Sequence, residues 1–211
     1  TGVLLFARRE VLARCCPQAQ FHYVLHDSET TVARNDIDRL PLLEAVERME
    51  QVFVGPLNPE REIELGLFKL RIPQYPIEGV REAVLNALTH RDYLNPGEIL
   101  VRHSAQELVV TSPGGFVAGI TPENILRHEA VPRNRTLANA LVKLRLVESS
   151  GIGRRRIFRS ALVYGKRRPQ YQTDGYTVTL RLFNRETHSA VAQVAARLDA
   201  AGAVVTLDHL L

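Results

Sequence analysis

The spacing of apolar residues predicts a chain that alternates between helices and strands. Leu42, Val46 and Met49 recur at helical spacing, which predicts a helix over residues 38–54. The alternation of apolar and polar residues in YTVTLRLF predicts a half-buried strand over residues 176–183. Further helices are expected at residues 77–90, 136–147, 154–165 and 186–201, and further strands at residues 63–70, 97–103 and 106–112.

Both ends of the sequence look like cut ends of a longer protein. The chain starts at Thr1 without a methionine, and near its end Thr206 resembles a helix N-cap with hardly any helix after it. The helix expected at 186–201 fits the beginning of a further module. We therefore expect a fragment whose neighbouring segments are not part of this sequence.

Composition narrows the class of protein. The 211 residues are 45% apolar and 24% charged, with a net charge of +4, which is typical of a globular domain and excludes a mostly disordered chain. Its longest apolar runs are far shorter than the roughly 18 residues of a membrane span. The adjacent Cys15 and Cys16 form neither a disulfide framework nor a zinc site, so we expect a cytoplasmic location.

The helix at 77–90 carries an unusual polar stripe. Glu82, Asn86 and His90 are each four residues apart, so they share one face, separate from the apolar face that contains Val80 and Val84. A carboxylate can act as a base, and an amide oxygen can bind a hard cation such as Mg²⁺. A solvated polar face explains the same three residues, and this helix alone does not decide between the two.

Two glycine pairs are candidates for contacts with a ligand. Gly114 and Gly115 follow an expected strand, and paired glycines allow either a plain tight turn or a close backbone approach to a ligand. Gly151 and Gly153 lead into an arginine-rich helix, whose N-terminal N–H groups favour phosphate, although a break between two packed helices is the alternative. The sequence contains no GxxxxGK[ST] P-loop.

Positive charge is concentrated in residues 127–168. This stretch holds twelve Lys and Arg residues against Glu129 and Glu148, so the rest of the chain is acidic. Such a segment attracts phosphates of a nucleotide or of nucleic acid, or it is a solvated basic face. Its few aromatic residues, Phe158 and Tyr164, argue against a platform for stacking single strands.

The order of these motifs is more specific than any one of them. YPIEGVREAVLNALTHRDY (75–93), LVVTSPGGFVAGITPENIL (108–126) and PRNRTLANALVKLRLVESSGIGRRRI (132–157) together resemble the bacterial RecG-C-terminal-like family of transcriptional regulators. That family is a divergent branch of the GHKL ATPases, and the resemblance covers roughly residues 1–183. It implies an α/β fold, a two-layer sandwich of a mixed sheet and helices of the GHKL (Bergerat) type. The first 74 residues would be its N-terminal extension.

The resemblance also implies a nucleotide site. Glu82 would be the catalytic, water-activating glutamate and Asn86 the Mg²⁺ ligand, with His90 on the same face. The glycine boxes would be represented first by Gly114 and Gly115 and then, at the phosphate end, by Gly151 and Gly153. Residues 116–150 would form the lid, including Arg133 and Asn134 in a basic loop.

Two departures from the GHKL pattern affect the expected chemistry. The segment TSPGG lacks the aspartate that reads the adenine amino group, and Thr89 and His90 stand where an acidic residue normally ends the first motif. The resemblance implies an ATP- and Mg²⁺-binding regulatory domain with slow hydrolysis at most. The alternative is a degenerate, non-enzymatic dimerisation scaffold that links DNA-binding modules.

The usual architecture of the family supplies the expected partners. An AlbA/Schlafen-like DNA-binding domain lies upstream, and a winged helix-turn-helix often follows, for which residues 184–211 would be the start. DNA would then be bound through modules outside this fragment, with a nucleotide and a second copy of the chain as further partners and no membrane involved. Direct binding of nucleic acid through residues 127–168 remains a third hypothesis.

Overall fold

The computed structural model describes residues 1–185 apart from positions 56, 66–67, 118 and 149–150. Its helices are α1 (Gly2–Phe6), α2 (Arg9–Cys15), α3 (Leu42–Val54), α4 (Ile77–His90), α5 (Arg135–Lys143) and α6 (Ile152–Val163). Its strands are β1 (Phe21–His26), β2 (Val32–Asp38), β3 (Glu60–Leu65), β4 (Phe68–Pro73), β5 (Ile99–His103), β6 (Glu107–Pro113), β7 (Gln170–Thr173) and β8 (Thr177–Phe183).

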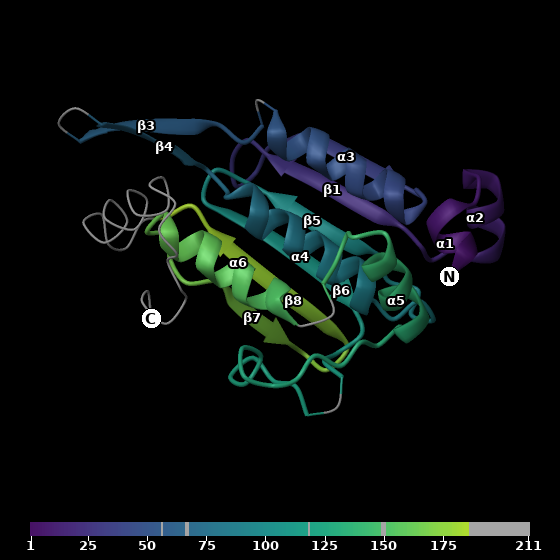
Figure 1. Cartoon of the computed structure of the whole chain (residues 1–211). Helices are drawn as coiled ribbons and strands as arrows, with labels where there is room; N and C mark the ends of the chain where they lie inside the picture. Colours follow the sequence, from purple (N-terminus) through teal and green to yellow (C-terminus); the bar gives the residue numbers. More distant parts are fainter. Residues whose placement is uncertain (56, 66–67, 118, 149–150, 186–211) are drawn as a thin grey trace.

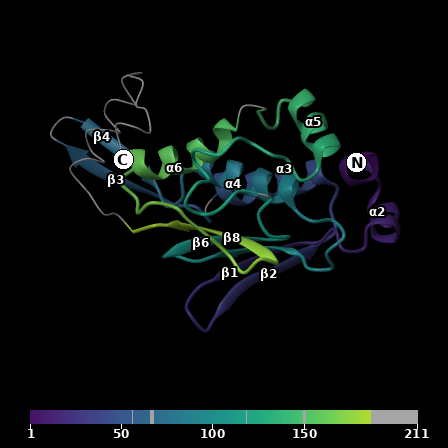
Figure 2. The same ribbon diagram turned by 90° about the horizontal axis from the view of Figure 1, so that it is seen from below.

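A six-stranded sheet with the order β2-β1-β5-β6-β8-β7 forms one layer of the protein. Strands β1 and β5 are parallel neighbours, whereas every other neighbouring pair in this sheet is antiparallel. Helices α3, α4 and α6 lie side by side over one face of the sheet (Figures 1 and 2). The predicted two-layer sandwich of a mixed sheet and helices is therefore confirmed.

The core lies between the sheet and the helices. A row of paired residues crosses the sheet from Tyr23 to Val101, Val110 and Leu180, and all four are buried. Because side chains alternate between the two faces of a strand, this row shows which residues of each strand face the helices. Helix α3 packs its apolar face into the same core, so that face is not free for a partner.

Helix α4 lies in the middle of the helical layer and packs closely against α6. A Cβ atom on Gly79 would lie 2.3 Å from the Oγ of Ser160, so the two helices approach through small residues. Most of α4 is buried, including Glu82 and Thr89. Of the polar stripe, Glu82 is therefore buried, whereas Asn86 and His90 are half-buried.

Several predicted boundaries were wrong for identifiable reasons. The helix predicted from residue 38 begins at Leu42, because Asp38 ends strand β2 and Pro41 precedes the first helical turn. The single strand predicted over residues 63–70 is a two-stranded antiparallel hairpin, β3–β4.

Helix α5 stops at Lys143 instead of residue 147, because the chain turns at Arg145. The edge strands β2 and β7 were not predicted. The helix predicted at 186–201, and almost all of the following module predicted at 184–211, lie outside the described residues.

None of the helices in the described part of the chain combines the length and hydrophobicity that a bilayer crossing requires.

Candidate functional site

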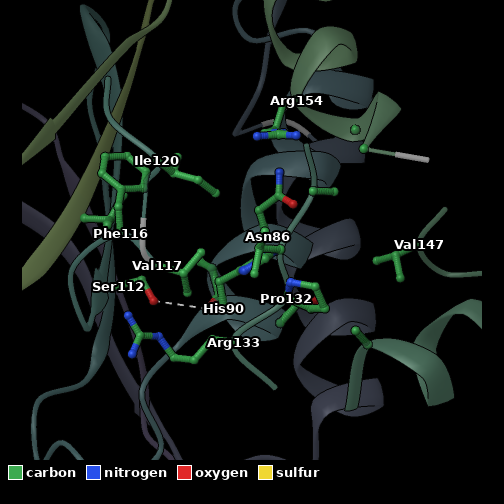
Figure 3. Close-up of a pocket in the computed structure, with 18 of the residues that line it drawn as sticks. Asn86, His90, Ser112, Phe116, Val117, Ile120, Pro132, Arg133, Val147 and Arg154 are labelled. Atoms are coloured by element: carbon green, nitrogen blue, oxygen red, sulfur yellow. Dashed lines mark hydrogen bonds between the residues drawn. The ribbon is translucent and has the colours of Figure 1, made fainter. Parts of the chain in front are cut away.

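A cavity of about 240 Å³ opens between α4, the neighbouring strands of the sheet, the loop that follows β6, and the start of α6. Its lining includes both glycine pairs and the polar stripe of α4. Figure 3 shows Asn86 and His90 pointing into this space, with Arg154 at one end and Arg133 at the other. Segments more than 60 residues apart in the sequence thus meet at one place.

Asn86 is the middle residue of the polar stripe. Its side-chain Nδ2 is buried and has no hydrogen-bond partner. The same holds for the Oγ1 of Thr89 and the Nε of Arg133, which also line the cavity. Buried polar groups in folded proteins almost always have partners, so three unpartnered atoms on residues that line one cavity are unusual.

Glu82 is buried at the end of the cavity nearest α6, where it is 4% exposed. Its Oε1 lies 3.3 Å from Nη1 of Arg156 and 3.6 Å from Nη1 of Arg81. Burial raises the pKa of the Glu82 carboxyl even though these two arginines oppose the shift. A carboxyl group with a raised pKa is better suited to accept a proton near neutral pH than an exposed one.

His90 lines the cavity one helical turn beyond Asn86. Burial lowers its pKa to about 4, and the positive charges of Arg154 and Arg133 lower it further in the same direction. The imidazole of His90 is therefore neutral at pH 7, and its ring can offer one hydrogen-bond donor and one acceptor. The positive charge in the cavity comes from the two arginines.

The two arginines hold the loop that closes the cavity. Arg133 donates a hydrogen bond to the carbonyl oxygen of Gly115, and Arg154 Nη2 donates to the carbonyl oxygen of His128 at 2.8 Å. Both guanidinium groups keep further N–H donors because each has five. Two cations at opposite ends of the cavity make it suitable for an anionic ligand.

Gly114 and Gly115 form the turn at the end of β6. Gly114 has a φ of +96°, and a Cβ on it would lie 2.8 Å from that of Asp92. A Cβ on Gly115 would lie 2.3 Å from the carbonyl oxygen of Gly175. The tight backbone packing alone requires glycine here, so the two residues line the cavity but are explained without a ligand.

Gly151 and Gly153 stand at the beginning of α6. Gly151 is the N-cap and has a φ of +70°, and the carboxylate of Glu82 lies against Gly153, where a Cβ would approach Oε2 to 2.3 Å. Gly151 and Gly153 line the same cavity as Glu82 and Arg154. A helix N-terminus with these neighbours is typical of a phosphate site.

Asn134 is the predicted site residue that does not line the cavity. Its Nδ2 donates to the carbonyl oxygens of Thr89 and Arg91, at 2.9 and 2.7 Å. The side chain therefore ties the beginning of α5 to the end of α4 and supports the cavity from outside.

The sequence did not single out several residues of the lining. Ser112 donates a hydrogen bond from Oγ to the carbonyl oxygen of Ala87 at 3.0 Å, and Phe116 and Tyr171 are 6.1 Å apart between ring centres. Together with Val110 and Leu180 they form an apolar end of the cavity. Tyr171 belongs to edge strand β7, which was not predicted, and no local signal could have placed it there.

Comparisons with known proteins agree with this architecture. Residues 97–182 match the model of a protein family described as "Putative ATP-dependent DNA helicase recG C-terminal". The chain is also similar to the crystal structure of the DIP2311 protein from Corynebacterium diphtheriae, with a TM-score of 0.75 and 29% sequence identity. That likeness covers 84% of this chain but only 37% of the other protein, so this chain spans little more than a third of its relative. A comparison with the curated proteins found no match.

The family match covers β5, β6, the closing loop, α5, α6 and most of the last two strands. These elements supply the glycine pairs, both cavity arginines and the apolar end. Over residues 97–182 the chain thus resembles the RecG C-terminal family, and its fold is an ATPase-like α/β sandwich of a mixed sheet and helices.

Proposed function

We propose that this chain is an ATP- and Mg²⁺-binding regulatory domain of a bacterial transcriptional regulator, with at most slow hydrolysis. One observation carries the proposal: three of the four buried side-chain polar atoms without partners in the described residues belong to the lining of one cavity. A ligand that combines a flat ring with charged phosphates would satisfy both ends of that cavity.

The base would lie at the apolar end, between the sheet and the loop after β6. Phe116, Tyr171 and Leu180 supply the apolar walls there. The Oγ of Ser112 uses its proton to bond Ala87, so its lone pairs are left to accept a hydrogen bond from an exocyclic amino group. A hydroxyl in this place selects adenine less strongly than a carboxylate, because the charge-assisted hydrogen bond is lost.

The phosphates would lie at the opposite end, against the beginning of α6. There the helix N-terminus, the guanidinium of Arg154 and the unpartnered amide of Asn86 all offer N–H donors or positive charge. Neutral His90 can serve as a further hydrogen-bonding group without adding charge.

The donor set fits Mg²⁺ in the mode that this ion prefers. Among the described residues no group of three or more His, Cys, Asp and Glu side chains could hold a metal ion. Mg²⁺ is usually held by one or two protein oxygens together with phosphates and water, so the amide oxygen of Asn86 meets that need only when a nucleotide is bound. When present, the ion would neutralise phosphate charge.

Any hydrolysis would depend on Glu82, whose raised pKa favours proton transfer from a water molecule. Its ion pairs with Arg156 and Arg81 hold the carboxylate back from the cavity, which agrees with slow turnover. The regulatory role and DNA binding by modules outside this chain follow from the family resemblance and are part of the proposal.

Thermal unfolding with and without MgATP tests the site. At about 100 times its dissociation constant a ligand adds roughly 2.7 kcal/mol, which raises Tm by about 5–10 °C for a chain of this size. We expect this rise with MgATP, a smaller rise without Mg²⁺, and loss of the Mg²⁺-dependent part in Asn86→Ala.

Asn35→Ala is the matched control, because Asn35 is exposed on edge strand β2, far from the cavity lining. This variant should show the full shift. If millimolar ATP, ADP and GTP all leave Tm unchanged, the nucleotide proposal fails and the dimerisation scaffold becomes the better hypothesis.

A further inference from the structure

Most of the cations in residues 127–168 have a structural role that the fold explains. Arg133 and Arg154 belong to the cavity, and Arg156 pairs with Glu148 and Glu82. The side chains of residues 167 and 168 lie over the rings of Phe183 and Phe158. Lys166 is buried and donates from Nζ to Asn184 Oδ1 at 2.7 Å, and Arg159 is half-buried. The other five of the twelve cations are exposed, and they are Arg127, Arg135, Lys143, Arg145 and Arg155.

These five exposed side chains belong to the segments that line the cavity; we call them the rim cations. Each is at most three residues away in the chain from a residue that lines the cavity. They come from the loop after β6, from both ends of α5 and from the start of α6 (Figure 1). Among the described residues, none of the five pairs with an acidic side chain.

Arg145 occupies a backbone position that favours glycine. Its φ is +57°, and it is the only described residue other than glycine that has a positive φ. The N–H of Leu146 bonds the carbonyl oxygen of Leu141 at 2.9 Å, and the N–H of Arg145 bonds that of Val142 at 2.9 Å. This pattern is a Schellman motif, in which the left-handed residue is usually glycine because a side chain is strained there.

Arg135 and Arg155 also stand where local stability favours other residues. They lie in the first turns of α5 and α6, and neither of those turns contains an acidic residue. The positive end of the helix dipole lies there, so a cation is unfavourable and an acid would be stabilising. Three of the five rim cations therefore cost stability at their positions, which a merely solvated basic face does not require.

We propose that the rim cations bind the phosphate backbone of a nucleic acid duplex, without reading its sequence. Guanidinium groups suit phosphate oxygens because their N–H donors match them two at a time, and four of the five are arginines. The aromatic residues of this stretch are not exposed, since Phe158 is buried and Tyr164 half-buried, so unstacked bases have no platform. The rim cations are not lining residues of the proposed nucleotide site, and the proposal involves no DNA-binding modules elsewhere in a longer protein.

Salt dependence tests the proposal directly. We would measure binding of the whole chain to a fluorescent duplex of scrambled sequence by anisotropy, over a series of salt concentrations. Five phosphate contacts predict a slope of about −4.5 for log K against log salt, or a loss of roughly 500-fold between 50 and 200 mM. A slope near zero would overturn the proposal.

Arg145→Gly separates binding from folding. Glycine relieves the strain at this position, so we expect Tm to rise by about 2–4 °C. Binding should nevertheless weaken by roughly eight-fold at 0.1 M salt, and the slope should fall by about 0.9. A variant that gains stability and keeps full affinity would contradict the proposal, and poor folding could not explain a loss.

Control variants distinguish binding through the rim cations from nonspecific attraction by any exposed cation. Arg14→Gln removes one exposed cation from α2 and should leave the slope unchanged. Lys143→Gln combined with Arg155→Gln should lower the slope by about 1.8. If poly-glutamate competes as well as a second duplex at equal charge, the surface binds acidic polypeptides and the nucleic acid proposal is wrong.

Discussion

The two glycine pairs, Gly114 with Gly115 and Gly151 with Gly153, look equivalent in the sequence, yet they have different surroundings in the structure. Gly115 is packed against the backbone of Gly175, and Gly114 has a left-handed conformation beside Asp92. Gly153 instead faces the carboxylate of Glu82, a side chain that can move. The first pair and Gly151, whose φ is +70°, are needed to build the fold, whereas Gly153 keeps space next to the carboxylate of Glu82. A glycine motif is therefore weak evidence for a ligand until its neighbours are known.

Gly115→Ala gives the largest expected effect. The new Cβ would meet a carbonyl oxygen of the backbone, which cannot rotate away, so we expect a loss of about 3 kcal/mol in the free energy of unfolding. Urea denaturation measures this value. Gly2→Ala is the control, because nothing lies within 4 Å of a Cβ there. A loss below 1 kcal/mol for Gly115→Ala would show that the turn has room to spare.

Two histidines, His103 in the core and His90 at the cavity, should make the free energy of unfolding depend on pH. Burial lowers the pKa of both His103 and His90 to about 4, below the value of about 6.5 in an unfolded chain. The unfolded state therefore binds protons first, and stability falls as the pH drops from about 6.5 towards 4. Between pH 7 and pH 5 each histidine contributes a loss of about 2 kcal/mol.

His90→Gln should remove the share of this pH dependence that belongs to the cavity. Urea denaturation of this variant at pH 7 and pH 5 should show a stability difference about 2 kcal/mol smaller than that of the unchanged chain. His103 remains in the variant, where Tyr23 Oη lies 2.7 Å from its Nδ1, and keeps its own share. An unaltered difference would mean that His90 titrates normally and that the cavity is wetter than its packing indicates.

Gly153→Ala tests the other side of the glycine comparison. The added Cβ would press on Glu82 Oε2, and because the carboxylate can shift we expect a loss of only about 1 kcal/mol. A double-mutant cycle with Glu82→Ala should reduce that loss nearly to zero, since the clashing group is then gone. Two losses that simply add would indicate that Gly153 is required by the helix backbone alone.

Glu82→Gln has the smallest expected effect on stability. Burial disfavours the charged carboxylate, and Arg156 keeps its pairs with Glu148 and Glu78, so the free energy of unfolding should change by less than about 1 kcal/mol at pH 7. Any ATP turnover, followed by phosphate release, should disappear. A loss of several kcal/mol would instead assign Glu82 to the fold and remove it from the chemistry.

The sequence predicted best the long helices and strands, in which a regular pattern of apolar residues persists. Helix α4 was predicted with its true bounds, and strand β8 within one residue, because their periodicities persist over many residues. The hairpin of β5 and β6 was predicted for the same reason. Prediction failed for short edge strands such as Gln170–Thr173, which are strands because they pair with β8.

The site was predicted in part. All the predicted site residues except Asn134 line the cavity, although their binding roles remain predictions. Arg154 was seen in the sequence only as one of three consecutive arginines, and the structure distinguishes it from exposed Arg155 and paired Arg156. Neighbours in sequence on a helix point in different directions, so which of them faces a cavity depends on the packing of that helix.

By itself the sequence determined the local conformations, the order of motifs and the excess of positive charge after residue 126, because these depend on neighbouring residues. Only the tertiary structure decided that Glu82 is buried with a raised pKa, that Asn86 lacks a partner, and that glycine turns 37 residues apart line one cavity. Burial and partnership depend on contacts between distant segments. Those contacts are fixed when the helices pack onto the sheet, and that is where the functional properties of this chain arise.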